Sequence, residues 1–235
     1  VKTPFSDVSE SLLKTPCVNL AAVNAGLDTF ASDKVLMEVA RGADLSAVQV
    51  LGAQNVSNRY YRVHPRRNDR FLRASTVLQA IYNEVDFSEF TFTRHMLGAL
   101  YDRSPDRFDI VVSELRAAWS ARMRNMLGQI GKRTILLWFS REELTDQPWQ
   151  EREKPLSADP LFITKSMVDG LSDLVMNTVI ARPSDIALSQ GTTGMYFPTM
   201  QAKAAADMLS VNSHIEASAK LIPKIKEGLT VSGKI

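Results

Sequence analysis

Four short apolar runs divide the chain, and amphipathic patterns of the helical type lie between them. The runs cover residues 17–23, 45–51, 134–139 and 174–181. Near-continuous apolar runs of this length are typical of strands that are covered on both faces, as in parallel sheets. Strands that alternate with helices predict right-handed crossover units. We therefore expect an α/β fold with a doubly wound, mainly parallel sheet.

The helical patterns are strongest over residues 106–130, where apolar side chains recur every three or four positions. A shorter helix is predicted from Ser32 or Asp33 as its N-cap to about residue 41, with Val35, Leu36 and Val39 facing inward. Further helices are predicted near residues 70–82, 92–101, 161–171, 199–209 and 214–229. Pro223 is expected to kink the last of these helices or to split it.

The length of 235 residues predicts one α/β domain. Residues 56–106 are too many for one crossover loop, so they are expected to form a helical insertion over the active face. The resemblance described below further implies that the domain lacks its N-terminal strand.

The composition excludes several classes of partner. The net charge of +2 is too balanced for nucleic acid or a membrane surface to be the main partner. A single cysteine, Cys17, excludes a disulfide within the chain and a zinc site with several cysteines. We expect no metal and no cofactor. Without a signal sequence or a long apolar span, cytoplasmic localisation is the default expectation.

Candidate chemistry lies in the loops that follow the strands, because parallel sheets bind ligands at their carboxyl ends. In Asn24-Ala25-Gly26, the glycine permits a tight turn and frees a backbone N–H. The segment from Gly52 through Gln54 and Asn55 offers a backbone N–H and a side-chain NH₂, the donors that an oxyanion hole needs. The same segment could instead form a turn that bonds its own backbone.

His214 opens the last predicted helix. There it could face the sheet edge as a general base, or it could be a partly exposed capping residue.

Together these loops resemble the sequence blocks of the SGNH (GDSL-type) hydrolase superfamily. Asn24-Ala25-Gly26 looks like its second block, and residues 52–55 look like a variant of its Gly-x-Asn-Asp block with one extra residue. The last block, Asp-x-x-His before a helix, is similar to His214 followed by Ala217, Ala219, Leu221 and Ile225. The resemblance covers most of the chain outside residues 56–106. It implies that the chain represents a separate bacterial branch of that superfamily. It implies a three-layer α/β/α fold of the flavodoxin type.

Two departures from that family stand out. Val211 occupies the place of the aspartate that orients the histidine, and Asn212 or Asp207 could substitute for it. The family's first block, Gly-Asp-Ser, supplies the nucleophile and follows a first strand. The resemblance implies that this strand and block lie upstream of Val1, because no early serine sits in a Gly-flanked turn.

An arginine-rich segment, residues 59–71, begins shortly after Asn55. Arginine forks beside aromatic rings are typical of sites that bind carboxylate, phosphate or sulfate. The alternative is a solvated face with ion pairs to Asp69, Glu84 and Asp86. If the segment overhangs the active face, at least two of its cationic side chains should lie near Asn55 and His214. These side chains are Arg62, His64, Arg66, Arg67 and Arg70.

Three functions remain open from the sequence. The first is an SGNH-like esterase that acts on an acyl or acetyl ester of a small molecule or carbohydrate, which could be anionic. His214 would be its base, Gly26 and Asn55 would stabilise the oxyanion, and Gln54 and Asn24 would bind the substrate. The second is a non-catalytic binding domain that recognises an anion through Arg62, His64, Arg66 and Arg67. The third is group transfer from an anionic donor. The oligomeric state is left open.

Overall fold

The computed structural model describes residues 3–231, and a three-stranded parallel sheet lies at their centre. Its strands are β1 (Ser46–Gln49), β4 (Thr134–Phe139) and β5 (Asn177–Ala181), in the order β1-β4-β5. All three coincide with predicted runs, so the mixed α/β class and the parallel pairing are confirmed. A separate antiparallel hairpin joins β2 (Tyr61–Val63) to β3 (Phe71–Ala74).

Helices connect and cover these strands. The α-helices are α1 (Phe5–Leu13), α2 (Leu27–Ser32), α3 (Lys34–Gly42), α4 (Thr76–Ile81), α5 (Thr93–Arg103), α6 (Pro105–Ile130), α7 (Lys165–Asp169), α8 (Asp185–Ser189), α9 (Ala202–Ala206) and α10 (Val211–Val231). The short 3₁₀ helices are η1 (Ala53–Asn55), η2 (Phe87–Glu89), η3 (Trp149–Glu151) and η4 (Thr199–Gln201).

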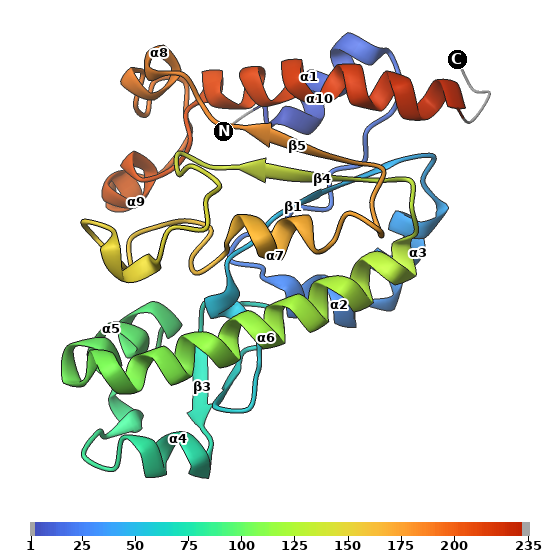
Figure 1. Cartoon of the computed structure of the whole chain (residues 1–235). Helices are drawn as coiled ribbons and strands as arrows, with labels where there is room; N and C mark the ends of the chain where they lie inside the picture. Colours follow the sequence, from blue (N-terminus) through green and yellow to red (C-terminus); the bar gives the residue numbers. More distant parts are fainter. Residues whose placement is uncertain (1–2, 232–235) are drawn as a thin grey trace.

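The central strand β4 is buried along its whole length and separates two apolar clusters. Ile135, Leu137 and Phe139 pack with Ala217 and Leu221 of α10. The alternate side chains of β4 belong to the larger cluster, to which α6 contributes most of its apolar face. In Figure 1, α1 and α10 lie above β5, whereas α6 and α2 lie below β1. Helices therefore cover both faces of β4.

The longest helix, α6, confirms the pattern over residues 106–130. Its N-terminus is fixed by Ser104, whose hydroxyl accepts a hydrogen bond from the Arg107 N–H, and by Pro105 in the first turn. Its first half extends beyond the sheet and packs against α5 (Figure 1). Residues 56–106 therefore gather around this end of α6 and the loop after β1.

The first predicted strand is wrong, because residues 17–23 form an extended coil. A strand needs a paired neighbour, and none of the described residues pairs with this run. Its apolar side chains are left in solvent, and Val18 and Val23 are 73% and 84% exposed.

The inward face predicted for α3 is also wrong. Asp33 caps this helix as expected, accepting hydrogen bonds from the N–H groups of Val35 and Leu36. However, Met37 is the buried side chain, and Val35 and Val39 are exposed. The helix packs on α6 through the face that carries Met37, so the valines point elsewhere.

Several shorter predictions are only partly right. The pattern near residues 70–82 contains β3 and α4 in place of one helix, because Ser75 starts a new cap between them. The helices expected over 161–171 and 199–209 shrink to α7 and to η4 with α9. The last helix, α10, is continuous from Val211 to Val231 with Pro223 inside it.

Between residues 3 and 231, we find no helix that is both long enough and apolar enough to cross a membrane.

Candidate functional site

His214 lies in the first turn of α10 at the carboxyl end of β4. Its ring meets Phe139, the last residue of β4, edge to face with 4.9 Å between ring centroids. The ring of Phe5 lies nearly parallel to the imidazole at 6.0 Å and also meets Phe139 at 5.9 Å, so the three rings form one cluster. Burial lowers the pKa of the imidazole to about 4, so His214 is uncharged at neutral pH.

A hydrogen bond from the backbone determines what this imidazole can do chemically. Its Nδ1 accepts a bond of 3.3 Å from the backbone N–H of Phe5. In a neutral ring the proton then lies on Nε2, which becomes a donor. A general base of the triad type needs the opposite tautomer, in which Nδ1 carries the proton and donates a hydrogen bond to a carboxylate. Within residues 3–231, neither Asp207 nor Asn212 makes that contact.

Asn55 lies in η1, just after β1, where the sequence predicts an oxyanion donor. Its Oδ1 accepts a hydrogen bond of 2.7 Å from the Thr93 hydroxyl. This bond fixes the carboxamide and leaves its NH₂ group for a ligand. The side chain is half-buried, so the group can be reached. The arrangement differs from the self-bonded turn that was the alternative.

Gln54 is turned inward and plays a structural part. It is 5% exposed, and its backbone C=O accepts a bond of 2.6 Å from the Tyr61 hydroxyl. Its Oε1 is buried without a hydrogen-bond partner among the described residues. The backbone carbonyl of Gln54 therefore anchors the hairpin to the sheet edge, and the carboxamide itself is buried.

Gly26 lies beside Asn55, but its N–H is already in use. It donates to the Asn68 Oδ1 at 2.7 Å, so this amide is not free for an oxyanion. A Cβ at this position would stand 2.7 Å from the backbone oxygen of Asn55. Only glycine permits such a close approach. The neighbouring Asn24 takes part in the same connection, because its C=O accepts a hydrogen bond from the Asn68 N–H at 3.0 Å. We call this connection of residues 24–26 with Asn68 the joint.

Asn68 is the centre of this joint, and we had not singled it out from the sequence. It is fully buried. Its Oδ1 also accepts bonds from the N–H and the hydroxyl of Thr29, and its Nδ2 donates to the His64 C=O at 2.8 Å. Asn68 thus ties the base of the arginine-rich turn to α2. No periodic signal marks such a residue, because it is a polar side chain inside a polar loop.

The β2–β3 hairpin places two arginines opposite each other. Arg62 of β2 and Arg73 of β3 are cross-strand partners, and both are exposed. The register shifts next to them, so Leu72 and Arg73 both point outward while Phe71 stays buried. Among residues 3–231, neither arginine forms an ion pair. Arg73 was missed because the sequence predicts a helix there.

The turn of this hairpin carries Arg66 and Arg67, which are also exposed and without an ion pair in the described part of the chain. Their backbone N–H groups both donate to the Nδ1 of His64 at 3.2 Å. His64 therefore shapes the turn and has no free Nδ1 for a ligand. Arg70 lies over the ring of Phe92, with 5.6 Å to its centroid.

The predicted meeting of this segment with His214 is not found. The hairpin and α10 lie on opposite sides of the sheet (Figure 1). The joint at Gly26 and Asn68 keeps the hairpin near Asn55, but its arginine side chains point to solvent. The alternative of a solvated face is confirmed in part, since most of these arginines are exposed. Within residues 3–231 they form no ion pairs with Asp69, Glu84 or Asp86, and Glu84 pairs with Arg103 and Arg107 instead.

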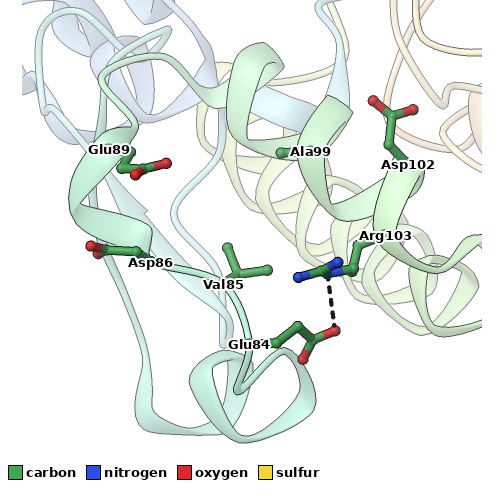
Figure 2. Close-up of a pocket in the computed structure, with 7 residues that line it drawn as sticks. All are labelled: Glu84, Val85, Asp86, Glu89, Ala99, Asp102 and Arg103. Carbon is green, nitrogen blue, oxygen red and sulfur yellow. Dashed lines mark ion pairs between the residues drawn. The ribbon is translucent and has the colours of Figure 1, made fainter.

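A cavity of about 420 Å³ opens elsewhere on the insertion, between α5 and the loop after α4. Figure 2 shows that carboxylates surround it and that Arg103 reaches Glu84 across it, at 3.6 Å. The hydrogen bonds from Arg107 lower the pKa of Glu84 to about 2. No group of three metal-ligating side chains occurs within residues 3–231, here or elsewhere.

Residues 1–229 match the family described as a domain of unknown function (DUF6473), and the chain belongs to this family. No curated protein and no solved structure matches the chain.

Proposed function

We propose that this domain binds an oxyanion through the exposed arginines of its β2–β3 hairpin. The observation that carries this proposal is the pair Arg62 and Arg73, opposite each other on two strands and without an acidic partner in the described chain. Like charges in directly opposed positions destabilise a hairpin. A bound phosphate, sulfate or carboxylate would offset that repulsion and would accept hydrogen bonds from both guanidinium groups.

The other face of the hairpin supports this proposal, because it is firmly held. Tyr61, Val63 and Phe71 are buried in the larger apolar cluster. The two arginines are therefore mounted on a rigid support, and little conformational entropy of the backbone is lost when a ligand binds.

The test is titration with orthophosphate, followed by NMR or calorimetry. We expect saturable binding that weakens at least about tenfold when Arg62 and Arg73 are both replaced by glutamine, because two charge-assisted bonds are lost. Arg124→Gln is the matched control, since Arg124 is a surface arginine that pairs with Asp173. Equal weakening in the control, or no binding by the unmodified chain, would overturn the proposal.

Ester hydrolysis on a doubly wound fold of the SGNH type is the second candidate. The free NH₂ of Asn55 and the uncharged His214 favour it, since Asn55 follows β1 and His214 contacts the last residue of β4 at the carboxyl edge of the same parallel sheet. In this candidate the nucleophile comes from outside residues 1–235. Phe5 must also release Nδ1 before His214 can act as a base.

That second candidate makes a clear prediction for the 235-residue chain alone. We expect it to hydrolyse p-nitrophenyl acetate no faster than its His214→Ala variant, because Nδ1 is occupied and no hydroxyl or thiol within residues 3–231 forms a hydrogen bond with the ring. The measurement is the initial rate of p-nitrophenolate release. Turnover that His214→Ala abolishes would show that a nucleophile lies within the chain.

A further inference from the structure

The hairpin carries two pairs of free cationic side chains, and their spacing bears on the size of the ligand. One pair is Arg62 and Arg73 on the strands, and the other is Arg66 and Arg67 in the turn. Arg66 follows Arg62 by four positions, so their Cα atoms lie within roughly 13 Å of each other. Two oxyanion groups of one small molecule can therefore reach both pairs at once.

We infer that the hairpin binds a ligand with at least two oxyanion groups, one at each arginine pair. This inference rests on the proposed function and extends it from a single anion to a ligand class. The class is a small molecule or carbohydrate that carries two or more phosphate or sulfate groups. Binding at both pairs raises affinity because the second contact forms within the same complex.

Hydrogen bonds on both sides of the turn fix the distance between the two pairs. The His64 N–H donates to the Arg70 C=O at 2.9 Å, which closes the hairpin at its base. The two backbone bonds to the His64 Nδ1 hold the turn itself, and Asn68 ties it to α2. The pairs are therefore presented at a set spacing, which favours ligands of matching length.

The charges around the two pairs also favour this class of ligand. Arg59 is engaged by Glu114 at 3.2 Å, and Glu84 is engaged by two other arginines. The nearest acidic residue in sequence is Asp69, whose Oδ1 is buried, and no ion pair joins it to the four arginines of the two pairs within residues 3–231. Four guanidinium groups thus remain for a ligand of several negative charges.

The experiment compares orthophosphate, tripolyphosphate and sucrose octasulfate on the full chain by isothermal titration calorimetry. Arg62→Gln with Arg73→Gln removes the strand pair, and Arg66→Gln with Arg67→Gln removes the turn pair. Arg124→Gln is the control. We expect a probe with several groups to bind at least about tenfold more tightly than orthophosphate. Removing either pair should bring that probe back to about the orthophosphate level.

The two polyanionic probes distinguish the source of the anionic groups. Loss in both double variants with tripolyphosphate alone assigns phosphate groups, and the same result with sucrose octasulfate alone assigns a sulfated carbohydrate. The inference is overturned if one double variant keeps its affinity for both probes within about twofold of the unmodified chain. In that case the proposed single-anion function still stands if orthophosphate binding depends on Arg62 and Arg73. Far-UV circular dichroism of each variant verifies that the hairpin variants stay folded.

Discussion

Replacing Asn68 with alanine is expected to lower the free energy of unfolding by about 3–5 kcal/mol. The side chain is fully buried and makes four hydrogen bonds, three through Oδ1 and one through Nδ2. Its loss leaves the N–H of Gly26 buried without an acceptor, and such a group costs about 1–3 kcal/mol by itself. Because this joint connects the hairpin to α2, the effect is far larger than that of a loop residue at the surface.

Urea unfolding followed by circular dichroism measures this change. Asn83→Ala is the matched control, because Asn83 is exposed, and it should shift stability by less than about 0.5 kcal/mol. The Asn68→Ala variant should also bind orthophosphate more weakly, since the arginine-rich turn loses its anchor. A loss of stability below about 1 kcal/mol would mean that water replaces the side chain and that the joint is not what orders the hairpin.

The elements that sequence analysis placed correctly are those whose signal is local. The strand β4 is apolar from Ile135 to Phe139 and is covered on both faces, and α6 combines a clear period with a serine cap and a proline in its first turn. The residues within such a segment are enough to predict its structure. The run over residues 17–23 has the same composition as a strand, yet pairing is a property of two segments, and the described chain supplies no partner.

In the candidate site, too, a placement that depends on neighbouring residues could be predicted, and the contacts between distant residues could not. Placing Asn55 after β1 needed only the strand and its direction. The engagement of Gly26 by Asn68 could not be predicted, because 42 residues separate the two. The pairing of Arg62 with Arg73 depends on a bulge that adds one residue to β3. A bulge of this kind changes which side chains lie on the same face of the hairpin. The spacing of apolar residues along the sequence does not reveal where such a bulge occurs.

Acid is expected to destabilise the fold through His214, and the sign follows from its pKa. Burial holds the pKa in the folded protein at about 4, below the ordinary value of 6.5. The unfolded chain therefore binds a proton first as the pH falls. The stabilisation is present above pH 6.5 and is lost progressively between that value and about pH 4. Between pH 7 and about pH 4.5, we expect a loss of about 2–3 kcal/mol from this group.

The variant His214→Gln isolates this contribution, because its Oε1 can still accept the Phe5 N–H but does not titrate in this range. Urea unfolding at several pH values should give a shallower pH dependence for the variant than for the unmodified chain. The difference between the two curves should develop below about pH 6.5, because near that pH the histidine of the unfolded chain begins to bind a proton and that of the folded chain does not. If the two curves run parallel down to about pH 4.5, His214 is solvated in solution and the contact of Phe5 with its ring is not maintained. In that case Nδ1 is free, and the esterase candidate loses its main structural obstacle.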